Sequence, residues 1–183
     1  MSKLKEVYDL DLAKEPEEYL RSDHLKSFLS PGKYVSDGHR YELFVEDCTW
    51  EEAAKKCEEK GGYLACLTTD EEFEIVDDLI KSEGMTNKVF YIGANRLGDH
   101  WWHWIDPDLT QDDCLGNGYW KHWLDGMPSY SEKLADGTEI EEEYAEYFYR
   151  KSDGMFYMND VPNDVIGYYP SYKGRMGYIC EYN

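Results

Sequence analysis

The sequence has no long hydrophobic run and few basic residues, and each shortage excludes a class of protein. No apolar stretch approaches the ~20 residues that a membrane-spanning helix needs, so no membrane insertion is expected. Lys and Arg number 19 against 39 Asp and Glu, which gives a formal net charge of −20. Such a charge repels the phosphates of nucleic acids and anionic membrane surfaces, so neither is an expected partner.

The amino terminus lacks the pattern of a signal peptide. The start, "MSKLKEVYDL", is too polar for the apolar core of such a segment. Two interpretations stay open: a cytoplasmic protein, or one that is exported by a non-classical route or has lost its signal. The five cysteines are an odd number, so at least one is unpaired within a monomer.

The length of 183 residues suits one well-packed domain with a short extension. Residues 1–33 are predicted to be a helical extension, because Pro16 suits a first helical turn and Ser30-Pro31-Gly32 ends the pattern. Residues 34–183 then form the main domain. Its aromatic content is high, with 17 Tyr and 6 Trp in the chain, which favours a β-rich, loop-rich fold or a binding surface.

Two helices are predicted in the first half of this domain. Each begins with a capping box, formed by Thr49 with Glu52 and by Thr69 with Glu72. Apolar residues then recur at helical spacing, which predicts one buried face on each helix. These faces comprise Trp50, Ala53, Ala54 and Cys57 in the first helix, and Phe73, Val76, Leu79 and Ile80 in the second.

Strand patterns follow the helices. "VFYIGAN" is typical of a buried strand, "HWWHWID" alternates tryptophans with polar residues, and "MGYICEY" closes the chain. A hairpin is predicted around Ser152-Asp153-Gly154. Between Pro107 and Gly154 the periodicity weakens, and a stretch of this length is expected to carry function or small strands of its own.

The order of these motifs resembles the C-type lectin-like domain. Tyr91–Ala94, "YIGA", is similar to the family's "WIGL" core, "WHWIDP" to its "W.W.dG" strand, and Tyr178–Glu181, "YICE", to its closing strand. The resemblance runs from Tyr34 to Asn183, about four-fifths of the chain. It implies an α+β fold in which two helices flank small antiparallel sheets with a long loop region.

The resemblance also implies a disulfide between Cys57 and Cys180, because the family pairs a cysteine of the first helix with one in the last strand. A bridge closing more than ~100 residues stabilises by about 4–5 kcal/mol, whereas a reducing cytoplasm would favour two buried thiols. The family's second disulfide looks absent, since Tyr144 and Asn163 stand at its positions. Together with the missing signal peptide, this suggests a bacterial or phage-like member.

Sugar-binding members of the family take calcium ligands from a Glu-Pro-Asn triplet, a Glu before the third strand and a "WND" motif. Here the triplet is "MPS", and methionine has no oxygen to offer calcium. Either Glu142 or Glu143 fits the second place, and Glu143 is taken as the candidate. The resemblance therefore implies a candidate calcium site of Glu143, Asn159 and Asp160, which other acidic residues could complete: Asp125, Glu132, Asp136 and Glu139.

These features predict a non-enzymatic recognition module that binds a protein or carbohydrate ligand through the long loop. The alternative is a calcium-dependent lectin with a rearranged ligand set. The predicted ligand-binding residues are Trp120, Met127, Ser129, Tyr130, Glu143, Asn159 and Asp160. Trp120 and Tyr130 are expected to be exposed and Trp123 buried, and the sequence has no glycine-rich phosphate motif.

Overall fold

A computed structural model describes residues 33–34, 38–98, 101–106, 109 and 119–183. The predicted helical extension, residues 1–33, lies outside these ranges apart from Lys33. No helix in the described part of the chain is long and apolar enough to cross a membrane.

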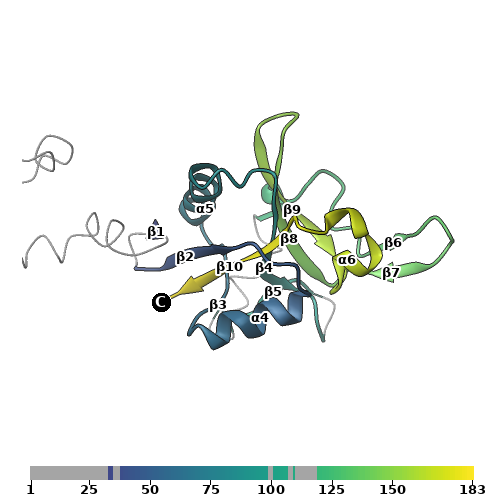
Figure 1. Ribbon diagram of the computed structural model, residues 1–183, viewed down its shortest axis with the longest axis horizontal. Helices are drawn as coiled ribbons and strands as arrows, with labels where there is room; N and C mark the ends of the chain where they lie inside the picture. Colours follow the sequence, from purple (N-terminus) through teal and green to yellow (C-terminus); the bar gives the residue numbers. More distant parts are fainter. Residues whose placement is uncertain (1–32, 35–37, 99–100, 107–108, 110–118) are drawn as a thin grey trace, which may run out of the picture.

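The described elements alternate between short strands and helices before a strand-rich second half (Figure 1). The first half holds β1 Lys33–Tyr34, β2 Arg40–Phe44, α4 Trp50–Glu59, β3 Tyr63–Leu64, α5 Asp70–Ser82, β4 Val89–Asn95 and β5 His103–Trp104. The second half holds η2 Tyr119–His122, β6 Ser131–Lys133, β7 Glu139–Glu141, β8 Tyr144–Arg150, β9 Met155–Val161, α6 Val165–Tyr168, η3 Pro170–Tyr172 and β10 Met176–Tyr182.

Most of these strands join one sheet in the order β1-β2-β10-β4-β8-β9, with β3 added to β10 and β5 to β4. The closing strand β10 lies parallel to β4 and antiparallel to β2. The expected α+β fold with antiparallel sheets is thus confirmed: among the described strand pairs only β10–β4 is parallel, and eight of the strands join one sheet. The hairpin β6–β7 stands apart as a two-stranded sheet within the long loop region.

The two helices begin where the sequence predicts. Both capping boxes are present, at Thr49 with Glu52 and at Thr69 with Glu72. Figure 1 shows α4 and α5 on opposite sides of the sheet. Each helix packs its apolar side into its own core cluster, so the sheet is covered on both faces.

Strand β4 shows how the sheet separates the two clusters. Its residues alternate between the faces, as the pleat of a strand requires. Phe90 and Ile92 belong to the cluster under α5, whereas Val89 and Tyr91 belong to the cluster under α4. The "VFYIGAN" motif is therefore buried on both sides from Val89 to Ala94, in agreement with the sequence-based expectation of a buried strand.

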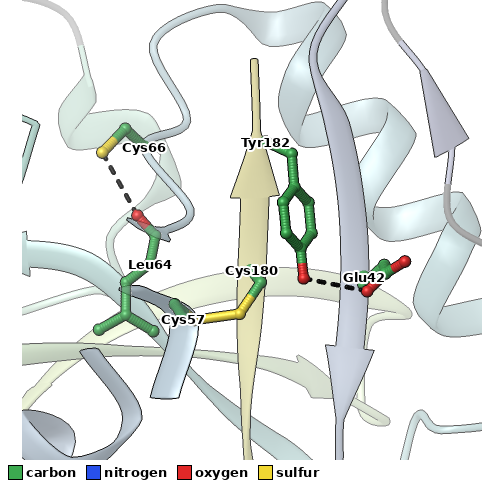
Figure 2. Close-up of a disulfide and its surroundings, with 6 residues drawn as sticks. All are labelled: Glu42, Cys57, Leu64, Cys66, Cys180 and Tyr182. Carbon is green, nitrogen blue, oxygen red and sulfur yellow. Dashed lines mark hydrogen bonds between the residues drawn. A yellow bond between two sulfur atoms is a disulfide. The ribbon is translucent and has the colours of Figure 1, made fainter. Parts of the chain in front are cut away.

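The disulfide between Cys57 and Cys180 is present and joins α4 to β10 (Figure 2). Its Cα atoms lie 5.5 Å apart, and it spans 123 residues of sequence. Cys48 and Cys66 are buried free thiols, and Cys114 lies outside the described residues. The bridge ties the first helix to the last strand at the centre of the sheet.

Tyr144 and Asn163, where the resemblance leads us to expect that a second disulfide is missing, both hydrogen-bond to Glu51. The Tyr144 hydroxyl donates to Glu51 Oε1 at 3.4 Å, and Asn163 Nδ2 donates to Glu51 Oε2 at 2.9 Å. The backbone amide of Glu51 in turn donates to Asn163 Oδ1 at 3.1 Å. A polar network through α4 therefore links the start of β8 to the segment before α6.

Candidate functional site

The long loop region is fastened to the start of helix α5. Lys121 and His122, on η2, both bind the Asp70 carboxylate, at 2.6 and 3.2 Å. The His122 ring also stacks on Phe73, with 3.6 Å between ring centroids. Burial lowers the pKa of His122, while its hydrogen bond to Asp70 opposes that effect. These contacts fix where the loop leaves the core.

Trp123 forms the floor of the loop region, as the sequence predicts. Its side chain is 3% exposed and packs against Trp102 with 4.9 Å between ring centroids. Its backbone pairs with Met158 on β9, and the next amide, that of Leu124, donates to the Met158 carbonyl at 2.9 Å. The side chain of Trp120 lies outside the described part of the structure, so its predicted exposure stays a prediction.

The turn from Met127 to Tyr130 is a part of the loop region that faces solvent. It contains a cis Met127–Pro128 peptide bond, and Pro128 is buried while Ser129 and Tyr130 are exposed. Tyr130 adopts a φ of 69°, in the left-handed region that non-glycine residues rarely occupy. Its amide donates to Asp160 Oδ2 at 2.6 Å, a charge-assisted bond that holds this backbone in place.

Arg96 clamps the same turn from the end of β4. Its Nε donates to the Glu142 carbonyl at 3.1 Å, and an Nη atom donates to the Tyr130 carbonyl at 3.3 Å. Its amide donates to the Glu143 carbonyl at 2.9 Å. The guanidinium also lies 5.2 Å from the centre of the Tyr130 ring, so the exposed tyrosine is held against a cation. Sequence reasoning missed Arg96, although a single arginine after a buried strand of an acidic chain was a usable signal.

Three carboxyl side chains lie buried beneath this turn: Glu142 at 5% exposure, Glu146 at 2% and Asp160 at 1%. We call them the loop cluster. The Ser129 hydroxyl donates to Glu142 at 3.0 Å, and Asn159 Nδ2 donates to Glu146 at 3.3 Å. Within the described residues, Glu146 Oε2 and Asp160 Oδ1 have no hydrogen-bond partner. The cluster is therefore incompletely satisfied.

Burial raises the pKa of each carboxyl in the loop cluster. The pKa of Glu142 rises to about 7, through burial and then through the charge of Asp160. The pKa of Glu146 rises to about 8 for the same first reason, and the pKa of Asp160 is also raised by burial. Near neutral pH the cluster thus favours retaining protons over carrying three negative charges.

Of the two glutamates that fit the second calcium-ligand place, Glu142 is the one whose side chain contacts the turn. Along Glu139–Glu143 the residues alternate between exposed and buried, and Glu142 is buried. Glu142 therefore meets Ser129, whereas Glu143, the predicted candidate, is half-buried and contributes its backbone carbonyl to Arg96. Both lie between β7 and β8, and their orientation depends on how this segment meets the turn, which the sequence did not reveal.

The remaining predicted residues are brought together in part. Tyr130 and Asp160 meet directly through the bond from the Tyr130 amide, whereas the Ser129 hydroxyl donates to Glu142. Asn159 lies on the same strand as Asp160 but donates its amide group to Glu146. Met127 is half-buried and packs against the core.

This arrangement does not fit a sugar-coordinating calcium ion. Calcium takes six to eight oxygen ligands, and Met127 supplies none at the first position. Asp160 and Glu142 bind the turn itself, and Asn159 is committed to Glu146. Across the described residues, three acidic, cysteine or histidine ligand atoms come within 4.8 Å of one another at a single place, which is not in the loop.

That place lies at the other end of the sheet and consists of His39, Glu72 and Glu181, which we call the base cluster. His39 Nδ1 lies 2.6 Å from Glu181 Oε1 and 3.7 Å from Glu72 Oε1. Glu72 and Glu181 are 2% and 1% exposed. Sequence reasoning did not find this cluster, because its members are scattered over more than 140 residues.

Comparison with protein families matches residues 46–157 to the lectin C-type domain. The chain belongs to the C-type lectin family. The match covers α4, α5, the loop region, β8 and the start of β9, so it includes the turn Met127–Tyr130, Glu142 and Glu146 but ends before Asn159 and Asp160. Calcium binding is common in this family, and one similar solved structure is a Ca²⁺-dependent type II antifreeze protein in its Ca²⁺-free form, with 18% identity over 81% of this chain and 95% of that one and a TM-score of 0.53.

Similar curated C-type lectins include two snake proteins. The chain is 31% identical over 102 residues to the snaclec bitiscetin subunit alpha of Bitis arietans, and 29% identical over 98 residues to snaclec A6 of Macrovipera lebetinus. The matches cover 56% and 52% of this chain, but only 66% and 54% of those relatives. These animal relatives give no support to the expectation of a bacterial or phage-like member.

Solved C-type lectin structures share the fold. Human lithostathine matches with a TM-score of 0.60 and 19% identity, covering 94% of this chain and 98% of its own. The C-type lectin domain of murine dendritic cell inhibitory receptor 2, solved with an N-glycan, matches with a TM-score of 0.50 and 20% identity, covering 78% of this chain and 89% of its own. The fold of this family is therefore shown, and such relatives are binding proteins rather than enzymes.

Proposed function

We propose that this C-type lectin is a non-enzymatic module that recognises its ligand through the turn Met127–Tyr130, without a sugar-coordinating calcium ion in the loop. The observation that supports this most directly is the bond from the Tyr130 amide to Asp160. A carboxylate that would serve as a calcium ligand instead holds the turn that presents Tyr130. The recognition surface is thus organised by the protein's own contacts.

Tyr130 is the proposed anchor of the ligand. Its side chain is 43% exposed, its backbone is fixed by Asp160, and its ring lies against Arg96. A rigid, exposed aromatic ring contributes much contact area at little entropic cost, and such rings dominate protein interfaces. Aromatic rings also stack on sugars, but the loss of oxygen at Met127 makes a protein ligand the favoured one.

The surroundings of Tyr130 favour a ligand surface that is neutral or basic. The β6–β7 hairpin beside the turn exposes Glu132, Glu139 and Glu141. The Tyr169 hydroxyl donates to Glu132, which ties the hairpin to the segment after α6. Combined with the overall charge of −20, this acidic rim accelerates association with positively charged partners.

Binding arrays test this proposal. The full chain is applied to a glycan array and to an array of purified extracellular proteins, in calcium and in the chelator EGTA. We expect hits that are unchanged by EGTA and weakened at least tenfold by Tyr130→Ala. Met155→Ala, which removes a 57%-exposed side chain at the β8–β9 turn, is the matched control and should leave binding unchanged. Hits that vanish in EGTA would instead identify a calcium-dependent lectin.

Two structural features of this module are also proposed. The domain is taken to begin at Tyr34, because β1 pairs with β2 and β2 pairs with the closing strand β10. The chain is taken to lack the family's second disulfide, because Tyr144 and Asn163 share Glu51 through hydrogen bonds. Limited proteolysis with mass mapping of the stable fragment tests the first, and thiol counting under denaturing conditions tests the second.

A further inference from the structure

The base cluster joins three segments that are far apart in the sequence. His39 immediately precedes β2, Glu72 lies in the first turn of α5, and Glu181 lies on β10. In the strand pairing, Arg40 faces Tyr182 and Tyr41 faces Glu181, so His39 sits at the very end of the β2–β10 ladder. Contacts at this point decide how firmly the start of β2 is held.

The two carboxylates are anchored from the interior side. Glu72 Oε2 accepts the amides of Thr68 and Thr69 at 2.6 and 2.8 Å. Glu181 Oε2 accepts the Cys66 amide at 2.7 Å. Both glutamates therefore belong to the rigid body of the domain, since α5 is packed into the core and β10 carries the disulfide.

His39 is the outer member of the cluster. Its side chain is 30% exposed, whereas those of Glu72 and Glu181 are 3% and 1% exposed. Among the described residues it is the basic side chain that contacts both carboxylates. The cluster thus brings two buried carboxyl groups together behind one partly exposed histidine.

Among the described residues, the other titratable groups that contact the cluster carry no positive charge. Tyr41 on β2 donates its hydroxyl to Glu72 at 3.1 Å, and Tyr63 on β3 donates to Glu181 at 3.1 Å. The Cys66 thiol and the Asp106 carboxyl also act on Tyr63 and its surroundings. All four groups are neutral or negative, so loss of the Glu181 proton leaves two buried negative charges close together.

We propose that the base cluster is a pH-sensitive latch, which holds the start of β2 on β10 and α5 in mild acid and releases it as the solution becomes alkaline. The segment that opens is the His39–Tyr41 end of the ladder, because Tyr41 faces Glu181 in the strand pairing and donates its hydroxyl to Glu72. The latch involves β2, β10 and α5, whereas the turn that carries recognition is bonded to β9, so the latch is separate from the proposed ligand surface.

The direction of the pH effect follows from Glu181. Burial, followed by the charge of Glu72, raises the pKa of Glu181 from an ordinary value of 4.5 to about 7. A raised pKa in the folded state contributes stability that is present below about pH 4.5 and lost as the pH rises through about 7. The latch should therefore weaken between pH 5.5 and 8.5.

Amide hydrogen exchange of the full chain tests the latch. We expect protection of Arg40 and Tyr41, corrected for the intrinsic rate, to fall at least tenfold between pH 5.5 and 8.5. Glu181→Gln keeps the size of the side chain and removes its charge. In this variant the protection of Arg40 and Tyr41 should therefore be the same at both pH values. Glu42→Gln is the matched control on β2, because Glu42 binds Tyr182 on the same ladder without joining the cluster (Figure 2).

A second variant keeps the test valid if Glu181→Gln does not fold. Glu72→Gln also removes one of the two buried charges and should flatten the same pH dependence. Corrected protection of Arg40 and Tyr41 that does not change with pH in the natural sequence would overturn the latch. The same conclusion would follow if either neutral variant kept the full tenfold change.

Discussion

The base cluster and the loop cluster bury similar numbers of carboxyl groups, but they satisfy them differently. In the base cluster, a histidine and several backbone amides surround Glu72 and Glu181. In the loop cluster, Glu146 Oε2 and Asp160 Oδ1 lack a partner among the described residues. An unsatisfied buried charge costs free energy. We therefore infer that the base cluster serves stability, whereas the loop cluster serves to hold a turn at the surface.

The disulfide holds β10, the strand that also carries Glu181 of the base cluster. Removing this bridge should have the largest effect on stability. We expect Cys57→Ala with Cys180→Ala to lower the free energy of unfolding by about 4–5 kcal/mol, because the bridge spans 123 residues. Guanidinium denaturation of oxidised protein measures this loss. Cys48→Ala, which removes a buried free thiol, is the control and should cost much less. Equal losses in the two variants would show that the bridge adds no stability.

Breaking the base cluster itself should have the next largest effect. Glu72→Ala removes the acceptor of the Thr68 and Thr69 amides and leaves the Tyr41 hydroxyl without its partner. We expect a loss of about 3 kcal/mol, since buried donors are left unpaired. Thermal and urea unfolding measure it, with the exposed neighbour Glu71→Ala as the matched control. A loss below that of the control would refute the structural role of the base.

Removing a charge from the loop cluster should stabilise the protein at high pH, whereas breaking the base cluster should destabilise it. The pKa of Glu146 rises from an ordinary 4.5 to about 8, so its contribution to stability is lost as the pH rises through that range. We expect Glu146→Gln to stabilise the protein by about 2 kcal/mol at pH 9 relative to its effect at pH 5. Urea unfolding at both pH values measures this, with exposed Glu141→Gln as the control. A pH-independent effect would contradict the raised pKa.

The sequence predicted those features that short-range patterns or the family resemblance define. The capping boxes at Thr49 and Thr69, the Cys57–Cys180 bridge and the buried Trp123 are all confirmed. Each depends on residue spacing within one element or on a motif of the family. The exposure of Tyr130 also followed from its place in the loop.

The sequence did not predict features that depend on how distant segments meet. The inward orientation of Glu142 depends on how the segment between β7 and β8 meets the turn, where the Glu142 amide donates to the Tyr130 carbonyl at 3.0 Å. The contacts of Arg96 join the end of β4 to a turn more than 30 residues later. His39 meets Glu181 only because β2 pairs with the last strand of the chain. Such contacts arise from the topology rather than from local sequence.

Calorimetric titration of calcium into the full chain tests the central claim, that the loop cluster serves the turn and not a metal. The natural sequence is compared with Asp160→Asn and with Met127→Glu/Ser129→Asn, which restores the oxygen ligands of the triplet. We predict no binding heat in the natural sequence that depends on Asp160, and a new Asp160-dependent heat only after the triplet is restored. One-to-one calcium binding by the natural sequence that disappears in Asp160→Asn would contradict the account.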